Sequence, residues 1–273
     1  MAADDLAARF GAVGLIAMWA PEVSFGPNGH WDVHDADARP GVSAPAMIKA
    51  ALATGAIAFV LFQSLPGLDM AIAHAFYEGN NRFSGLNSSL VWTVRNGFSF
   101  AFYFVCAATV VGLVVAGRPA GSFLGLAFNK WLFLTLCLII GPLVISNIGF
   151  KDHWGRARPR DVIEFGGAKA FTPVFPPSDQ CGYNCSFVSG EASAVYIVFF
   201  AVAFLLRRHS RRLILLGIVL GSLAGLTRIA QGGHFLSDVI FAGVLMALTA
   251  ASLQLLFDTI RTADVAERRE APA

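Results

Sequence analysis

Residues 131–150 of the chain are WLFLTLCLIIGPLVISNIGF, a run of 20 residues without a charged side chain. A helix needs about 20 mostly apolar residues to cross the hydrocarbon core of a bilayer. An α-helix also pairs its own backbone N–H and C=O groups, so lipid tolerates it where it excludes open strands and loops. The run therefore predicts a membrane-spanning helix.

Five more apolar stretches on either side of this run approach the same length. They are Met47–Leu65, Phe98–Gly117, Phe187–Leu206, Leu213–Ala230 and Phe235–Phe257. The 273 residues are 56% hydrophobic and 14% charged, with a mean hydropathy of +0.62, whereas about a quarter of a soluble domain is charged. We predict an all-α polytopic membrane protein, a six-transmembrane-helix bundle formed by residues 45–260.

The first 44 residues do not follow this pattern. Ala12–Ala20 is apolar but too short to cross a bilayer. Residues 21–44 are rich in Gly, Pro, His and Asp, which predicts irregular structure. We interpret residues 1–44 as an arm that has room for one short interfacial helix.

Arginine residues predict the orientation of the bundle. Loop 207–212 and the tail 261–273 contain Arg207, Arg208, Arg211, Arg212, Arg261, Arg268 and Arg269. Short Arg-rich loops stay in the cytoplasm, so both termini are predicted on the cytoplasmic side of the membrane, which in a bacterium is the inner membrane. Loops 66–97, 146–186 and 231–234 then face the periplasm. The outer segment 151–169 is also basic, which conflicts with this rule unless its cations have a function.

Five ionisable residues lie at ends of the predicted spans. Lys151 follows the third span, Glu191 begins the fourth and Arg228 ends the fifth, while His234 and Asp238 begin the sixth. Because successive spans alternate in direction, all five are predicted to gather at the outer face. Ionisable residues in membrane helices are costly and usually functional, so we expect the active site there.

The spacing of these residues suits the binding of a phosphate. Lys151 and Arg158 are seven residues apart, which predicts one helical face two turns apart, until Pro159 disfavours the helix. Ser189 and Gly190 are small residues at a helix start, where backbone N–H groups are free to meet an anion.

The spacing of His234 and Asp238 suits a nucleophile. Four residues apart on a helix, they are predicted to face each other, so that the carboxylate accepts one ring N–H. The other ring nitrogen is then free to act as a base or nucleophile.

Together the three clusters resemble the type 2 phosphatidic acid phosphatase (PAP2) superfamily. The matching patterns are Lys-x6-Arg-Pro at 151–159, Ser-Gly at 189–190 and Thr-Arg-x5-His-x3-Asp at 227–238, and the resemblance covers roughly residues 50–255. It implies that His234 forms a phosphohistidine and that Asp238 orients it. It also implies a phosphate-binding set of Lys151, Arg158, Ser189, Gly190 and Arg228. Neither metal nor cofactor is implied, because fixed cations and amides supply the charge that stabilises a phosphoryl group.

The second motif departs from the family pattern. Glu191 replaces the histidine that protonates the leaving group, and Val188 replaces a proline. Glu191 can be that acid only if its surroundings keep it protonated, and nearby cations oppose this. The alternatives are a weakly basic leaving group, an orienting role for Glu191, or a proton from His153.

Other residues near the motifs give weaker expectations. Arg156 is a candidate for contact with the substrate head group, and Trp154 for an aromatic at the membrane interface. Cys181 and Cys185 could form a disulfide in an oxidising compartment, and no further ligands suggest zinc. Residues 65–69 and 76–77 resemble the family's lid, or else form an amphipathic helix on the membrane surface.

The leading hypothesis is a lipid phosphatase. Its candidate substrates are lipid A phosphate, undecaprenyl pyrophosphate and phosphatidylglycerol phosphate, and residues 184–192 (NCSFVSGEA) are similar to variants of lipid A phosphatases. The alternatives are a lipid phosphotransferase with the same intermediate and a non-catalytic protein that binds or transports lipid phosphates. A net charge of +2 without a basic tract argues against nucleic acid. The oligomeric state is not predicted.

Overall fold

The computed structural model describes residues 22–25, 31–34, 41–118 and 122–270. The chain divides into two units, Met1–Pro40 and Gly41–Ala273, which are described separately. In the first unit, strands β1 (Glu22–Phe25) and β2 (Trp31–His34) pair antiparallel. The prediction of irregular structure at 21–44 is therefore wrong for these two segments, where apolar and polar residues alternate as in a strand. The predicted interfacial helix at Ala12–Ala20 lies outside the described residues.

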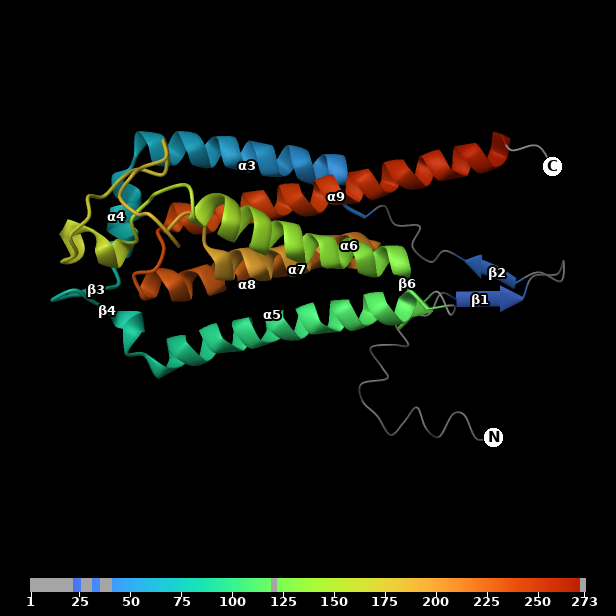
Figure 1. The fold of residues 1–273 in the computed structure, drawn as a ribbon, viewed down its shortest axis with the longest axis horizontal. Coiled ribbons are helices and arrows are strands. Elements are labelled where there is room, and N and C mark those ends of the chain that lie inside the picture. Colours follow the sequence, from blue (N-terminus) through green and yellow to red (C-terminus); the bar gives the residue numbers. More distant parts are fainter. Residues whose placement is uncertain (1–21, 26–30, 35–40, 119–121, 271–273) are drawn as a thin grey trace. The chain divides into compact units, whose positions relative to one another are not determined.

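The second unit is a helix bundle (Figure 1). Its main helices are α3 (Ala44–Ser64), α4 (Gly67–His74), α5 (Ser89–Ala116), α6 (Phe128–Leu138), η2 (Ile139–Lys151), α7 (Gly190–Leu205), α8 (Ser210–Ala230) and α9 (Leu236–Glu270). The short elements are β3 (Tyr77–Gly79), β4 (Arg82–Phe83), η1 (Ser84–Leu86), β5 (Ser122–Phe123), β6 (Leu126–Ala127), η3 (Pro159–Asp161), η4 (Ile163–Phe165) and η5 (Arg207–His209).

Five helices in the described part of the chain are long and apolar enough to cross a membrane. They are Ala44–Ser64, Ser89–Ala116, Phe128–Lys151, Arg207–Ala230 and Leu236–Ala263. The fourth predicted span is the shorter apolar helix α7, with 16 residues. The prediction of an all-α polytopic membrane protein is confirmed, and the count of six spans depends on α7.

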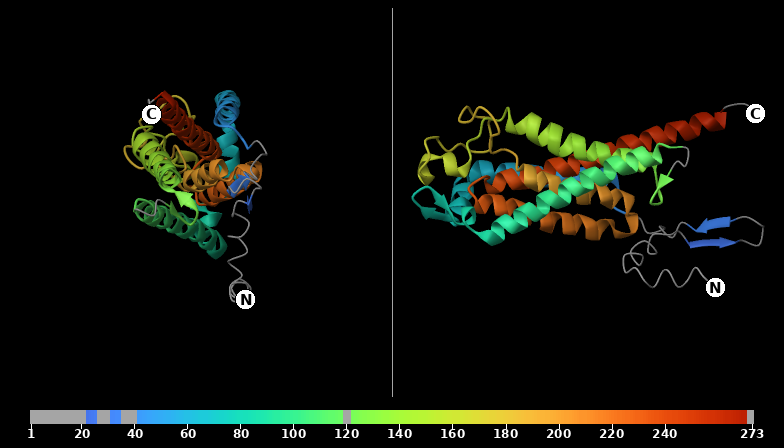
Figure 2. Two further views of the ribbon diagram at one scale, coloured as in Figure 1. Left: turned by 90° about the vertical axis from the view of Figure 1, so that its right-hand side faces the viewer. Right: turned by 60° about the horizontal axis from the view of Figure 1, so that its bottom comes forward.

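Helix α7 lies in the centre of the bundle. It packs against α8, α9 and α6, and α3 runs alongside α9 (Figures 1 and 2). Most α7 side chains are buried, including Val195, Ile197 and Phe200. By contrast, α5 exposes large apolar side chains such as Phe100 and Phe104, which suit contact with lipid. A span that is enclosed by protein can be shorter than the bilayer is thick.

Glycines let α8 approach its neighbours closely. Gly217, Gly221 and Gly225 are four residues apart, so they lie on one face of the helix. A Cβ atom on Gly221 would clash with the ring of Tyr196, and one on Gly225 would clash with Val239. This small-residue stripe, common between membrane helices, fixes the end of α8 against α7 and α9.

The third span changes its winding before it reaches the site. Its second half, η2, is a π-helix that contains Pro142, which has no N–H and disrupts regular α-helical pairing. The Asn147 side chain donates to the Pro142 carbonyl oxygen over 2.8 Å, and Ser146 donates to Ser193 on α7. Wide turns of this kind often occur at functional sites.

Two helices extend beyond the predicted spans. Helix α5 begins at Ser89 rather than at Phe98, and the Ser88 side chain accepts the N–H of Val91 as an N-cap. Helix α9 continues to Glu270, so most of the predicted tail is helical. The longer α5 brings Arg95 into a helix, which becomes important below.

Candidate active site

Four helix ends meet at one end of the bundle, together with α4 and the loops after η2 (Figures 1 and 2). Lys151 ends η2, and its Nζ lies close to Gly190, the first residue of α7. A Cβ atom on Gly190 would be only 2.8 Å from this Nζ. Oxygen Oε1 of Glu191 lies 3.2 Å from Nε of Arg228 on α8. Oxygen Oε2 lies 4.0 Å from Nε2 of His234. The structure thus brings these motif residues together.

His234 is fully buried, and its two ring nitrogens have different surroundings. Nδ1 lies 2.6 Å from the backbone carbonyl oxygen of Ser186, which can only accept, so Nδ1 carries the proton. Nε2 has no hydrogen-bond partner within the described residues. Burial lowers the pKa of His234 to about 4, which keeps the imidazole neutral and its Nε2 lone pair available as a nucleophile.

Asp238 does not bond His234 directly as predicted. Its Oδ2 lies 3.7 Å from Nδ1, which is too long for a hydrogen bond. Instead, Oδ2 accepts the N–H of Phe235 over 2.8 Å and the hydroxyl of Ser186. His234 precedes α9 rather than lying inside it, so the i, i+4 geometry of a helix does not apply. Asp238 is therefore linked to the imidazole through Ser186, whose hydroxyl donates to the carboxylate and whose carbonyl oxygen contacts Nδ1.

Arg156 is buried, and the expectation that it contacts a head group is wrong. Its side chain is 1% exposed, and its Nη atoms lie 2.7 Å from Asp238 and 2.8 Å from Asp69. It also donates to the Ser237 hydroxyl and stacks on the ring of Phe235 at 4.3 Å. Such a guanidinium balances two buried carboxylates, which would otherwise be costly.

Asp69 attaches α4 to the start of α9. Its carboxylate accepts the Ser237 N–H over 2.9 Å and the Ser237 hydroxyl, in addition to Arg156. The residue is 1% exposed. The segment predicted as a lid or surface helix therefore contains a short helix with one side fixed in the protein interior. Sequence reasoning did not identify Asp69 as part of the site.

A loop, not a helix, carries Arg158, so the prediction of a shared helical face with Lys151 is wrong. The helix ends at Lys151, and Gly155 follows with a φ of +72°, a left-handed conformation that favours glycine. A Cβ atom there would also clash with the carbonyl of Ser178. Arg158 Nη2 donates to the backbone oxygen and side-chain Oδ1 of Asn184, over 2.7 and 2.8 Å.

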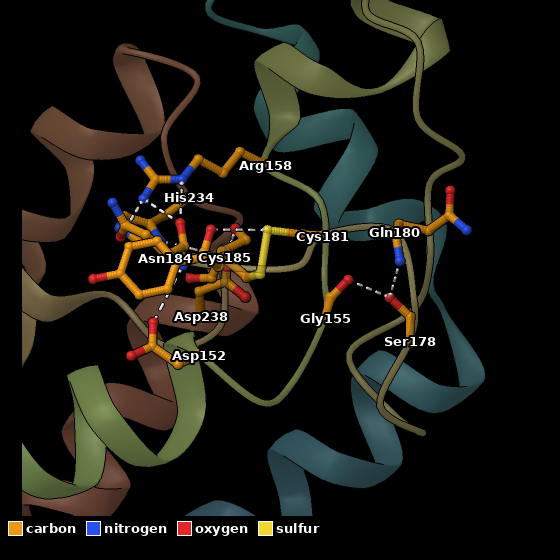
Figure 3. Close-up of a disulfide and its surroundings, with 12 residues drawn as sticks. Asp152, Gly155, Arg158, Ser178, Gln180, Cys181, Asn184, Cys185, His234 and Asp238 are labelled. Carbon is orange, nitrogen blue, oxygen red and sulfur yellow. Dashed lines mark hydrogen bonds and ion pairs between the residues drawn. A yellow bond between two sulfur atoms is a disulfide. The ribbon is translucent and has the colours of Figure 1, made fainter.

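Two stretches of the connection between η2 and α7 are joined by hydrogen bonds, and the second stretch also contains a disulfide (Figure 3). The N–H of Cys185 donates to the Lys151 carbonyl oxygen over 2.8 Å. The N–H of Ser186 donates to the Arg156 carbonyl oxygen over 2.9 Å. Cys185 also forms a disulfide with Cys181, as one of the sequence alternatives proposed. The segment from Asn184 to Ser186 therefore contacts both Arg158 and the ring of His234.

Unpartnered polar atoms gather at this point. Five buried side-chain atoms in the described part of the chain have no hydrogen-bond partner: Thr172 Oγ1, Ser189 Oγ, Arg228 Nε, Gln231 Nε2 and His234 Nε2. Three of these belong to predicted site residues. Arg228 Nε faces Glu191 at 3.2 Å without hydrogen-bond alignment, while its Nη1 donates to Gln231. Buried polar groups without a partner are unusual, and a bound anion would accept from the donors among them.

Ser189 and Gly190 start α7 at the same point. Ser189 is the N-cap residue, but its hydroxyl makes no cap hydrogen bond. The first N–H groups of a helix have no partner within the helix, and they carry partial positive charge. The start of α7 thus adds backbone donors to the side-chain cations of Lys151 and Arg228.

A cleft of about 250 Å³ opens beside the site, between α5, η2 and α7. Polar side chains line one part of it, namely Arg95, Ser99, Asn147, Lys151 and Glu191. Apolar and aromatic residues line the rest, namely Phe98, Phe102, Tyr103, Pro142, Gly190 and Ala194. This division suits an amphiphile with an anionic head. Arg95 was not predicted, although a lone arginine next to a membrane span is itself a functional signal.

His153 and Trp154 differ from their expected positions. His153 is exposed, and its Nδ1 contacts the carbonyl oxygens of Ile148 and Gly149 at 2.8 and 3.1 Å. No contact with the motif residues is found for it among the described residues. Trp154 packs inward against Phe187 and donates to a backbone carbonyl, so it does not belong to an interfacial belt.

The fold and site define a membrane-embedded enzyme that handles a phosphate group of an amphiphile. The chain belongs to the PAP2 superfamily, whose profile matches residues 130–261. It is 35% identical over 199 residues to the lipid A 4'-phosphatase of Francisella tularensis subsp. novicida (strain U112), covering 70% of this chain and 87% of the relative. Together these findings make it a membrane lipid phosphatase that acts on phosphate monoesters.

Two further comparisons give a second relative and a shared fold. The lipid A 4'-phosphatase of Rhizobium etli is 27% identical over 215 residues, covering 73% of this chain and 82% of the relative. A crystal structure of a transmembrane PAP2 type phosphatidylglycerolphosphate phosphatase from Bacillus subtilis shares the fold. Its TM-score is 0.50 at 19% identity, with 80% of this chain and 97% of that chain covered.

Proposed function

We propose that the chain hydrolyses a phosphate monoester of lipid A, or of a lipid A precursor, at the periplasmic face of the inner membrane. The observation that carries the chemistry is the convergence of three unpartnered buried atoms, Ser189 Oγ, Arg228 Nε and His234 Nε2. They supply two donors and one nucleophile. The relatives named above support the choice of lipid, since they act on lipid A at a phosphate.

The reaction proceeds in two steps through a phosphohistidine. Nε2 of His234 attacks phosphorus, and the bond from phosphorus to the lipid oxygen breaks, with both electrons leaving on that oxygen. Lys151, Arg158 and Arg228 hold the three phosphoryl oxygens, with the N–H groups at the start of α7. Water then attacks the phosphohistidine, which releases inorganic phosphate and restores the imidazole.

The leaving oxygen takes a proton, and Glu191 is a poor donor for it. Its carboxylate is paired with Arg95 at 3.0 Å and with Arg228 at 3.2 Å, and such a pair favours the charged form of the group. Solvent in the open cleft is the better proton source. A departing anomeric sugar oxyanion is also less basic than an ordinary alkoxide, so such a leaving group needs less help from an acid.

Two features support the periplasmic orientation. The Cys181–Cys185 disulfide belongs to the loop that carries the site, and disulfides persist in oxidising compartments such as the periplasm. The Arg-rich segment 207–212 follows α7 at the opposite end of that helix from Gly190, as expected for a cytoplasmic loop. Both termini are then cytoplasmic.

The test is a phosphate-release assay with the purified protein in detergent. We expect release from lipid A precursors above undecaprenyl pyrophosphate and phosphatidylglycerol phosphate, and we expect it to survive EDTA and be blocked by vanadate. Radiolabelled lipid phosphate should leave an acid-labile label on wild-type protein and none on His234→Ala. His209→Ala, at the other end of α7, is the matched control.

The same assay separates the alternatives. Transfer of the label to an added acceptor lipid instead of to water would favour the phosphotransferase. Equal phosphate release by wild type and His234→Ala would overturn the proposed nucleophile. No release from any lipid phosphate would favour the non-catalytic binding protein.

A further inference from the structure

Glu191 and Arg95 form an ion pair that the three phosphate motifs do not explain. Arg95 Nη2 and Nε lie 3.0 and 3.3 Å from Oε1 of Glu191. The same oxygen lies 3.2 Å from Nε of Arg228, and Oε2 lies 4.0 Å from Nε2 of His234. One carboxylate therefore links a cation of the phosphate site to a cation outside it, and it also faces the nucleophile.

This carboxylate stands where the substrate phosphate has to bind. An attacking nitrogen needs its target atom about 3–3.5 Å away. Because Oε2 of Glu191 is only 4.0 Å from the His234 Nε2 atom, a phosphoryl group does not fit between them. Two anions this close also repel each other strongly where water is excluded. Glu191 must move aside when phosphate binds.

The cleft offers both space and a partner for this movement. Arg95 and Glu191 line the cleft of about 250 Å³, and their side chains are 27% and 24% exposed. The Arg228 side chain is 7% exposed and is held by Gln231, so it stays in place. Arg95 meets the carboxylate with two aligned N–H groups, whereas Arg228 Nε is misaligned. The weaker of the two pairs is the one to break.

We propose that Glu191 is a displaceable internal anion and that Arg95 is its docking cation. In the free enzyme Glu191 neutralises Arg228. When phosphate binds, Glu191 stays with Arg95 alone and releases Arg228 to the phosphate oxygens. Arg95 is thus a positioning residue, because it keeps the carboxylate out of the path of the phosphoryl group. The inference rests on the proposed function, since it assumes that phosphate binds at His234.

The experiment measures the affinity for inorganic phosphate by calorimetry, on detergent-purified full-length protein. Glu191→Gln should bind phosphate roughly tenfold more tightly, because no internal anion competes. Arg95→Gln should bind it roughly tenfold more weakly, because Glu191 then remains on Arg228. The double variant should match Glu191→Gln, since Arg95 has no role without the carboxylate. Arg95→Lys, which keeps the charge, should recover part of the affinity.

Several outcomes would overturn the inference. A loss of phosphate affinity in Glu191→Gln would show that the carboxylate does not compete. An equal loss from Arg95→Gln with and without Glu191 would show that Arg95 binds phosphate directly. Arg118→Gln, at the far end of α5, removes the same charge and should change nothing. If wild type binds phosphate but cleaves no lipid phosphate, the proposed function fails and this inference stands. If wild type cleaves a lipid phosphate but binds no inorganic phosphate, this inference fails and the proposed function stands.

Discussion

Nδ1 of His234 lies 2.6 Å from the carbonyl oxygen of Ser186, so a backbone group selects the tautomer of the proposed nucleophile. Asp238, which the sequence pattern places opposite the ring, lies 3.7 Å from the same nitrogen. Its carboxylate instead holds the hydroxyl of Ser186 and the N–H of Phe235. The carboxylate thus positions the carbonyl that positions the imidazole, and this indirect arrangement has measurable consequences.

Asp238→Asn should lower kcat by only about 10- to 100-fold, because the Ser186 carbonyl still fixes the tautomer. Where a carboxylate bonds the histidine directly, the same change costs about 10⁴-fold. Steady-state kinetics on a lipid phosphate would measure the difference. Ser186→Ala removes the hydroxyl that Asp238 holds but leaves the carbonyl in place, so it should lose no more than Asp238→Asn, whose carboxylate also holds the Phe235 N–H. A loss as large as that of His234→Ala would contradict the indirect role.

The pH dependence should reflect the burial of His234, which lowers its pKa from 6.5 to about 4. The nucleophile must be neutral, so kcat/KM should hold as the pH falls through 6.5 and decline only near the lower value. Between pH 6.5 and about 4, His234 binds a proton in the unfolded chain but not in the folded chain. Stability should therefore be full above pH 6.5 and fall as the pH drops toward 4, by up to about 3 kcal/mol.

Thermal unfolding and kcat/KM, each measured across the acidic range, would check both statements. His234→Ala should lack this component of the pH-dependent stability. An acid limb of kcat/KM at pH 6.5 would instead indicate a solvated imidazole.

The sequence predicts the helices well because each apolar run has to pair its own backbone groups in lipid. It predicts the meeting of Lys151, Glu191, Arg228 and His234 for the same reason, since helix direction alternates with every span. It fails where loops decide the geometry. Gly155 ends the helical path to Arg158, and no local pattern indicates which carbonyl the resulting loop then presents.

The residues that were missed or given the wrong role are those whose roles depend on distant partners. Asp69 and Arg156 are 87 residues apart, yet they lie within 2.8 Å of each other in the interior. Neither belongs to a spacing that a helix or strand could explain. Arg95 was missed because the apolar run begins at Phe98, although the Ser88 N-cap starts the helix earlier. An N-cap signal read together with hydropathy would have included it.

Arg156→Met should destabilise the fold by about 3–5 kcal/mol, because it leaves Asp69 and Asp238 buried without a cation. Adding Asp69→Asn should recover part of this loss, since one of the two uncompensated charges is then removed. Thermal unfolding in detergent would measure both variants. Arg160→Met, whose side chain is 41% exposed, is the matched control and should change little. Equal stability of Arg156→Met and wild type would show that the buried ion pairs do not form.

The Cys181–Cys185 disulfide should make the side of the site testable in cells. In Cys185→Ser, the remaining half-buried Cys181 thiol should react with a membrane-impermeant maleimide added to intact bacteria, if its loop is periplasmic. A Cys181→Ser/Cys185→Ser variant, with only Cys106 and Cys137 in their spans, should not react. His209→Cys added to that variant should react only after the inner membrane is permeabilised, because its loop is predicted on the cytoplasmic side. Loss of the four-residue crosslink should also cost about 2 kcal/mol of stability. Labelling of His209→Cys in intact cells, together with no labelling of Cys181 in Cys185→Ser, would reverse the orientation.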